Sequence, residues 1–176
     1  MRIKMLILDV DGVLTDGRKV YSNKGVETKQ FNDKDFTAIK RFSASGVKVV
    51  FLSGDENINK SIASSRNIDF YYARLKTGVI SKASFLSRFE NFYKIDRKDM
   101  AYVGDDLFDL DIINALDLTF CPKDAIKDIK EACLKVLDKN GGDGVVVDLY
   151  NYAIDQNLID PCQLETIKKL DSCEKY

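Results

Sequence analysis

The stretch that most constrains this chain is a mainly apolar run at residues 3–8 that ends in Asp9, Val10 and Asp11, followed by Gly12. A short apolar run closed by a turn signal is typical of a buried parallel strand. Open α/β sheets bind their ligands at the carboxyl ends of such strands. Strand alternation would point both carboxylates to one face, where two charges about 4 Å apart repel by ~4 kcal/mol at a dielectric constant of roughly 20. The pair therefore predicts either a bound cation or a proton on one carboxylate.

The rest of the chain alternates between strand and helix patterns. Strands are predicted at 47–52, 69–72, 100–103, 118–121 and 132–137, and helices at 34–45, 56–66, 79–93, 107–115, from 125, at 145–155 and at 161–170. Residues 18–31 are the exception, because a turn containing Gly25 separates two short extended runs and predicts a β-hairpin. Strands that alternate with helices form a parallel sheet with helices on both faces. We therefore expect a doubly wound, Rossmann-like α/β fold with a hairpin flap after the first strand.

Composition narrows the possible chemistry. The 176 residues include no histidine, which excludes Ser-His-Asp, Cys-His and histidine-ligated metal chemistry. A formal net charge of −1 argues against a nucleic-acid partner bound by phosphate neutralisation. The first apolar run is too short for a signal peptide or a membrane span, so we expect a cytoplasmic protein with no membrane partner. The length predicts one domain at residues 1–156, with residues 157–176 as its helical extension.

Further polar clusters follow other strands or begin a helix. They are Ser53 and Gly54, Lys82, and Asp105, Asp106 and Asp109. In a doubly wound sheet the strand-end clusters converge on one rim, and a lysine at a helix start can reach it. A carboxylate nucleophile, a hydroxyl, backbone N–H groups, a lysine and carboxylates able to bind Mg²⁺ are the parts that phosphoryl transfer needs. The sequence therefore predicts phosphoryl chemistry with Mg²⁺ as the cofactor.

These four clusters resemble, in order, the four motifs of the haloacid dehalogenase-like phosphatases. Within that family the chain is similar to the 3-deoxy-D-manno-octulosonate 8-phosphate phosphatases and to the phosphatases of nine-carbon keto-sugar acid 9-phosphates. The closer similarity rests on the hairpin and on three segments, at residues 14–17, 31–35 and 141–144. The resemblance covers about residues 3–150 and implies a phosphatase that acts on a phosphorylated 2-keto-3-deoxy sugar acid.

The resemblance also implies a role for each motif residue. Asp9 would attack phosphorus and form an aspartyl phosphate, while Asp11 would protonate the leaving oxygen and then activate water. Mg²⁺ would be bound by Asp9, Asp105 and the backbone carbonyl of Asp11. The phosphate would be held by Ser53, Gly54 and Lys82, with Lys76 as an alternative lysine. Asp106 or Asp109 would orient Lys82 or water, and the implied sugar pocket contains Thr15, Asn32, Lys34 and Asp35.

Several of these residues also have a purely structural explanation. Ser53 can cap a helix N-terminus, and Asp106 can be a helix-start charge that the helix dipole favours. Asn32, Lys34 and Asp35 can cap and solvate the helix that begins nearby. A solvated turn with no ligand is likewise an alternative for Asp9 and Asp11 taken alone.

The spacing of the motifs leaves no room for a cap domain over the site. Only 41 residues separate Asp11 from Ser53, and 22 separate Lys82 from Asp105. The resemblance implies that capless members form homotetramers in which one subunit's hairpin shields the neighbouring site, and we expect the same here. Asp55 and Glu56 stand where octulosonate phosphatases usually carry arginine, so an eight-carbon or a nine-carbon substrate remains open.

Two functions of other classes are alternatives to a phosphatase. A receiver domain uses the same side chains with Mg²⁺, but its phospho-acceptor aspartate ends a middle strand and its lysine comes late in the chain. Here the middle strand ends in Ser53 and the last cluster is acidic. A catalytically silent domain that only oligomerises would not need the complete set of motif residues, so the phosphatase is preferred.

Overall fold

The computed structural model describes residues 2–74 and 81–174, apart from the side chains of Val26 and Glu27. Short 3₁₀ turns join some of the helices and strands. In chain order the elements are β1 (Met5–Leu8), β2 (Val20–Ser22), β3 (Gly25–Thr28), α1 (Asp33–Ala44), β4 (Lys48–Ser53), α2 (Asn57–Ser65), β5 (Asp69–Tyr72), η1 (Ala83–Phe85), α3 (Leu86–Tyr93), η2 (Arg97–Asp99), β6 (Met100–Val103), η3 (Leu107–Asp109), α4 (Leu110–Ile113), β7 (Leu118–Cys121), α5 (Lys127–Ala132), β8 (Lys135–Val136), α6 (Val145–Asp155) and α7 (Leu164–Asp171).

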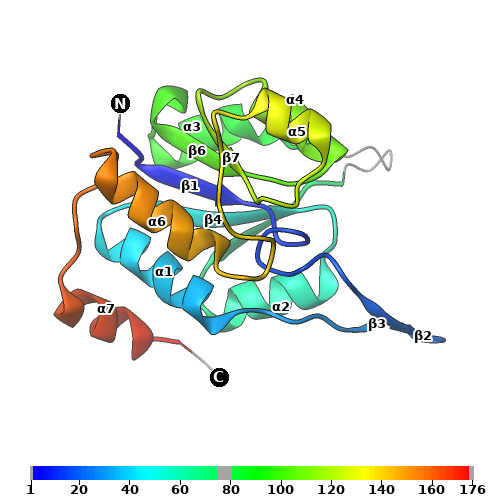
Figure 1. The fold of residues 1–176 in the computed structure, drawn as a ribbon. Helices are drawn as coiled ribbons and strands as arrows, with labels where there is room; N and C mark the ends of the chain where they lie inside the picture. The colour runs from blue at the N-terminus through cyan, green and yellow to red at the C-terminus, as the bar shows by residue number, and fades with distance from the viewer. Residues whose placement is uncertain (1, 75–80, 175–176) are drawn as a thin grey trace.

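Six strands form one parallel sheet in the order β5-β4-β1-β6-β7-β8 (Figure 1). β1 lies at the centre, with Leu8 paired to Phe51 on one side and to Val103 on the other. The chain crosses from β1 to β4 and later returns beside β1 as β6, so the strand order reverses at β1. This reversal is the position at which open α/β sheets bind ligands. The predicted doubly wound fold is confirmed.

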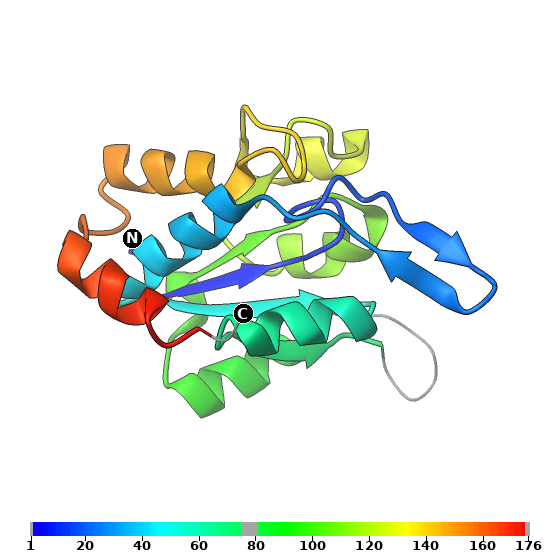
Figure 2. The same ribbon diagram turned by 90° about the horizontal axis from the view of Figure 1, so that it is seen from below.

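Helices cover both faces of the sheet because every central strand is apolar on both sides. Leu6 and Leu8 of β1 belong to a core cluster that includes residues of α1 and α6. Met5 and Ile7 point the other way, into a cluster with residues of α3, α4 and α5. Figures 1 and 2 show the two helical layers with the sheet between them.

The hairpin β2–β3 forms a separate two-stranded sheet that projects from the body of the molecule (Figure 2). Val20 and Tyr21 of β2 are 58% and 68% exposed. Within residues 2–74 and 81–174, no segment folds into a cap domain over the carboxyl edge of the sheet. None of the helices in those residues is long and apolar enough to cross a membrane.

The predicted helix at 79–93 is shorter in the structure. Val79 and Ile80 lie outside the described residues, and regular α-helix begins only at Leu86, after the 3₁₀ turn η1. Ser81 N donates to Ala73 O at 3.4 Å, and Ala83 N donates to the Asp111 carboxylate at 3.1 Å. These tertiary contacts hold the segment around Lys82 outside the helix, so the prediction of its start was wrong.

The segment predicted as a C-terminal extension contains α7, which packs against α1. Lys40 of α1 is buried and forms ion pairs with Asp171 and Glu174. Arg66, after α2, also pairs with Glu174 at 2.9 Å. The end of the described chain is therefore attached to the helical layer that faces away from α3.

Candidate active site

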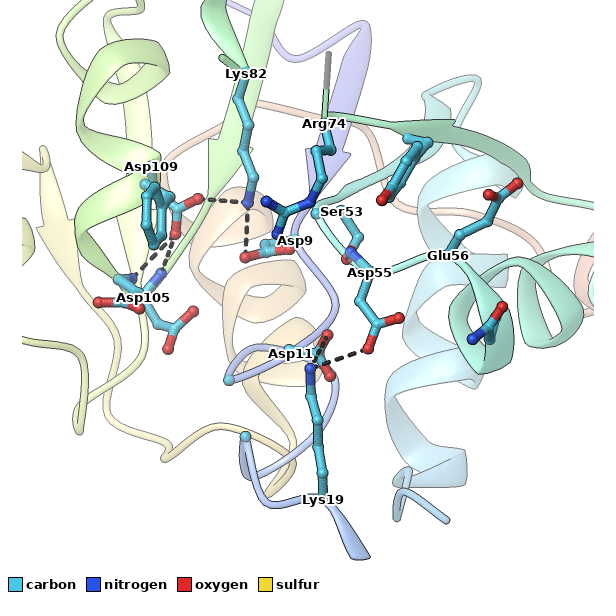
Figure 3. Close-up of a pocket in the computed structure, with 17 residues that line it drawn as sticks. Asp9, Asp11, Lys19, Ser53, Asp55, Glu56, Arg74, Lys82, Asp105 and Asp109 are labelled. Carbon is cyan, nitrogen blue, oxygen red and sulfur yellow. Dashed lines mark hydrogen bonds and ion pairs between the residues drawn. The ribbon is translucent and has the colours of Figure 1, made fainter. Parts of the chain in front are cut away.

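A pocket of about 640 Å³ lies at the carboxyl ends of β1, β4 and β6 (Figure 3). The motif residues that line it come from all four predicted clusters. They are Asp9, Asp11, Ser53, Gly54, Lys82, Asp105, Asp106 and Asp109. Because parallel strands end at one rim, residues far apart in the sequence share one cavity, as the strand pattern predicted.

Lys82 is buried against Asp9 and Asp109. Its Nζ lies 2.8 Å from Asp9 Oδ2, 2.5 Å from Asp109 Oδ1 and 3.0 Å from the Tyr102 hydroxyl. Burial by itself lowers the pKa of Lys82, but the two carboxylates outweigh it and raise this pKa above its usual value. The ammonium is therefore a fixed positive charge beside Asp9. Lys76 lies outside the described residues.

Asp109 positions its neighbours through both carboxylate oxygens. Oδ1 accepts hydrogen bonds from Lys82 and from the Tyr102 hydroxyl. Oδ2 accepts from the backbone N–H groups of Asp105 and Asp106, at 2.8 and 3.1 Å. The side chain of Asp106 instead accepts from Leu107 N at 2.7 Å and caps the turn η3. Of the two aspartates considered for orienting Lys82, Asp109 is the one that contacts it.

Asp9 and Asp105 together suit a hard cation. One carboxylate oxygen from each of Asp9, Asp105 and Asp109 lies within 4.8 Å of the other two, but Asp109 already has its hydrogen bonds. Asp105 Oδ1 is buried with no hydrogen-bond partner among the described residues. Burial raises the pKa of Asp9 to about 7, and burial with the charge of Asp9 raises the pKa of Asp105 to about 8. A cation between these oxygens would stabilise both ionised carboxylates, so the residues fit Mg²⁺.

Gly12 allows the loop after β1 to approach Asp105 this closely. Its φ is +84°, and a Cβ added there would lie 2.0 Å from Asp105 Oδ2. The glycine-rich segment 141–144 supports the same loop, because Gly142 N donates to Val13 O at 3.0 Å. A larger side chain at Gly12 would displace Asp105, which explains the glycine after Asp11 in physical terms.

Asp11 points away from Asp9, toward the base of the hairpin. Its carboxylate lies 2.7 Å from Lys29 Nζ and 3.4 Å from Lys19 Nζ. β1 ends at Leu8, so strand alternation does not extend to Asp11, and the expectation that both carboxylates share one strand face was wrong. Each carboxylate has its own lysine, and this arrangement removes the repulsion between Asp9 and Asp11 that was expected from the sequence.

Ser53 is the last residue of β4 and is 1% exposed. Its hydroxyl oxygen accepts hydrogen bonds from Asn59 Nδ2 at 3.0 Å and from Asp55 N at 3.2 Å. It is not the N-cap of α2, which is Glu56. Both Ser53 and Gly54 face the pocket, where a hydroxyl and a backbone N–H can meet an anion.

The four residues expected in a sugar pocket do not line this cavity. Thr15 is buried, and its hydroxyl oxygen accepts from the N–H groups of Gly12 and Gly17. Asp35 is also buried and accepts from Val146 N and Val147 N at the start of α6. Asn32 caps α1 by accepting from Lys34 N. Thr15, Asn32 and Asp35 therefore have structural roles within one chain, and the expectation that these residues and Lys34 line this cavity is not met.

The sequence did not single out four other residues of the site. Lys19 and Arg74 line the pocket, and Lys29 and Asn59 support Asp11 from behind it. Figure 3 shows Arg74 among the side chains that line the pocket. Lys19 and Lys29 flank the hairpin that follows Asp11 closely in the sequence, and this proximity was a usable signal.

The fold and the pocket define a capless α/β hydrolase, and sequence comparison gives its family. The profile of the haloacid dehalogenase-like hydrolases matches residues 55–149. The chain belongs to this family and is a phosphatase within it.

Individual relatives are consistent with this placement. The chain is 32% identical over 142 residues to the 3-deoxy-D-manno-octulosonate 8-phosphate phosphatase of Haemophilus influenzae, covering 81% of this chain and 77% of that protein. The match to its Escherichia coli (strain K12) counterpart, also 32% identical, spans 64% of that protein. The cobalt-bound structure of the H. influenzae enzyme superposes with a TM-score of 0.80 at 30% identity over 88% of each chain. A Moraxella catarrhalis phosphatase structure with magnesium, phosphate and KDO is similar in fold, with a TM-score of 0.79, 24% identity and coverage of 89% of each chain.

Proposed function

We propose that this phosphatase hydrolyses the phosphate monoester of a 2-keto-3-deoxy sugar acid, with 3-deoxy-D-manno-octulosonate 8-phosphate as the first substrate to test. A nine-carbon 9-phosphate is the second candidate, because Asp55 and Glu56 line the pocket where arginine was expected. The observation that carries the proposal is the buried Asp9 carboxylate on the pocket wall, between Lys82 and Asp105. The similarity to a 3-deoxy-D-manno-octulosonate 8-phosphate phosphatase supports the substrate class.

The proposed mechanism has two displacements at phosphorus. Asp9 attacks the phosphoryl group, the bond to the sugar oxygen breaks, and Asp11 gives that oxygen its proton. Asp11 then takes a proton from a water molecule, which attacks the aspartyl phosphate and releases inorganic phosphate and free Asp9. Ser53, the Gly54 N–H and Lys82 stabilise the charge on the phosphoryl oxygens.

The test is a phosphate-release screen over sugar phosphates with Mg²⁺ present. Turnover of a keto-deoxy sugar acid phosphate well above that of simple hexose phosphates is the expected result. Comparison of the eight-carbon and nine-carbon esters by kcat/KM then chooses between the two candidates. Turnover of hexose phosphates alone would contradict the substrate class, and release from none of the esters would contradict the proposed reaction.

Magnesium would be held by Asp9, Asp105 and the backbone carbonyl of Asp11, and when bound it would neutralise charge between Asp9 and the phosphate dianion. The metal-free carboxyls of Asp9 and Asp105 have pKa values of about 7 and 8, above the ordinary 3.8. The folded protein therefore binds protons that the unfolded chain has lost, so its stability without metal falls as pH rises from about 4 to 8. Mg²⁺ binds the ionised pair, and we expect it to raise the melting temperature more at pH 8 than at pH 6.

Differential scanning fluorimetry with and without Mg²⁺ measures this effect, and chelation should abolish phosphate release. Asp105→Asn should lose most of the Mg²⁺-dependent increase in melting temperature. Asp117→Asn is the matched control, because Asp117 is exposed and does not line the pocket. An equal increase at both pH values, or an increase that survives Asp105→Asn, would contradict this metal site.

We also propose that the protein is a homotetramer in which the hairpin covers the site of a neighbouring subunit. Val20 and Tyr21 on the projecting hairpin offer exposed apolar surface for such a contact. Light scattering should give a mass of about four times the 19.9 kDa chain. Tyr21→Lys should shift the mass toward the single chain and raise KM, whereas a wild-type protein that measures as a monomer would contradict the assembly.

A further inference from the structure

Lys29 lies at the base of the hairpin, immediately after β3, and its side chain is only 1% exposed. We propose that Lys29 is a positioning residue that fixes the orientation of the Asp11 carboxylate. This inference rests on the proposed role of Asp11 as the acid that protonates the leaving oxygen. It assigns to the hairpin a task inside its own subunit, in addition to covering a neighbour's site.

The ammonium of Lys29 is surrounded by acceptors. Nζ lies 2.7 Å from Asp11 Oδ1 and 3.0 Å from Oδ2, 2.9 Å from Asp55 Oδ2 and 2.8 Å from Asn59 Oδ1. An ammonium group has three N–H donors, and here three side chains provide acceptor atoms for them. Lys29 is therefore held in one place, and the carboxylate beside it is held as well.

Asn59 completes the support from the opposite side. Its carbonyl oxygen accepts from Lys29, while its Nδ2 donates to Asp11 Oδ2 at 3.1 Å and to Ser53 Oγ at 3.0 Å. This amide orientation matches every partner, with oxygen toward the cation and nitrogen toward the carboxylate. Asn59 thereby connects Asp11, the proposed acid, to Ser53, the proposed phosphate ligand.

The charges around Asp11 balance without Lys82. Asp11 and Asp55 supply two carboxylates, and Lys19 and Lys29 supply two ammonium groups. The Lys19 side chain is 22% exposed and lies 3.4 Å from Asp11, whereas that of Lys29 is buried and closer. Lys29 is thus the main cation of Asp11, as Lys82 is of Asp9. Removing Lys29 would free the carboxylate to turn away from the leaving oxygen.

The experiment compares two aryl esters of similar shape, phenyl phosphate and 4-nitrophenyl phosphate, with Mg²⁺ present. The nitrophenolate leaves with little help from an acid, whereas the phenolate needs protonation more. Because general acid catalysis contributes about 10²–10⁴-fold, Lys29→Met should lower kcat/KM for phenyl phosphate at least about tenfold more than for 4-nitrophenyl phosphate. Asp11→Asn should show the same selective loss, and Lys29→Arg should restore part of the phenyl phosphate activity.

Lys98→Met is the matched control, because Lys98 is exposed, lies before β6 and does not line the pocket; it should leave both values unchanged. If Lys29→Met does not fold, Lys29→Met with Asp55→Asn removes one charge of each sign and must show the same selectivity. An equal fall for both esters, or no fall, would overturn the positioning role of Lys29. An equal fall for both esters in Asp11→Asn would instead contradict the proposed acid. Wild-type protein that hydrolyses neither these esters nor a keto-deoxy sugar acid phosphate would contradict the proposed function itself.

Discussion

Replacing Asp9 with asparagine is expected to lower phosphate release by at least about a thousandfold, because the amide cannot form the covalent intermediate. The substitution keeps the shape of the side chain, and Lys82 keeps Asp109 as a partner at 2.5 Å. Burial already raises the pKa of Asp9 to about 7, which shows that the ionised carboxylate is disfavoured where it lies. Asp9→Asn should therefore fold normally and unfold at an equal or higher denaturant concentration than wild type.

Steady-state phosphate release and denaturant unfolding measure the two parts of this prediction. Asp117→Asn carries the same chemical change at an exposed position and should retain full activity. Trapping labelled phosphate on the protein after acid quench should succeed with wild type and fail with Asp9→Asn. Activity that survives Asp9→Asn would show that the attack on phosphorus does not come from this residue.

Replacing Lys82 with methionine is expected to lower kcat/KM by about 10²–10³-fold, because a fixed charge beside the phosphoryl group is lost. It should also destabilise the fold by about 3–5 kcal/mol, as removal of one partner from a buried ion pair does. Lys82 is 2% exposed and is the cation that Asp9 and Asp109 share. Its loss leaves two buried carboxylates close together.

A double variant separates the two effects of Lys82. Asp109→Asn added to Lys82→Met removes the unpaired charge from Asp109, and Asp9 can take up a proton. The free energy of unfolding should recover in the double variant, while kcat/KM should stay low. Recovery of activity together with stability would show that Lys82 acts only by holding the fold.

Strands and helices that depend on local patterns were predicted well. β5, β6, β7 and α6 have the predicted first and last residues. Each strand is a short apolar run that ends at a polar turn, and such a run can bury itself only in a covered sheet. The predicted ends of β4 and β6 placed Ser53 and Asp105 at one rim, because parallel strands all finish on the same side of the sheet.

Contacts distant in sequence caused the errors. The apolar spacing of residues 79–93 continues through Lys82, yet tertiary hydrogen bonds to Ala73 and Asp111 hold that segment out of the helix. Thr15 and Asp35 are polar residues beside motif segments, and the sequence does not tell whether such oxygens face a ligand or the backbone. Here both bind backbone N–H groups, which a buried loop and a helix start require.

The sequence by itself predicted that Asp9, Asp11, Ser53 and Asp105 belong to one site, because residue type and strand-end position are local properties. The tertiary structure decided which charges meet. Asp9 pairs with Lys82 and Asp11 with Lys29, each from a segment that the chain brings in from elsewhere. The Asp9 and Asp11 carboxylates, which should repel each other, point in different directions and are stabilised by different cations. Ion pairing depends on distance in space, and only the folded chain sets that distance.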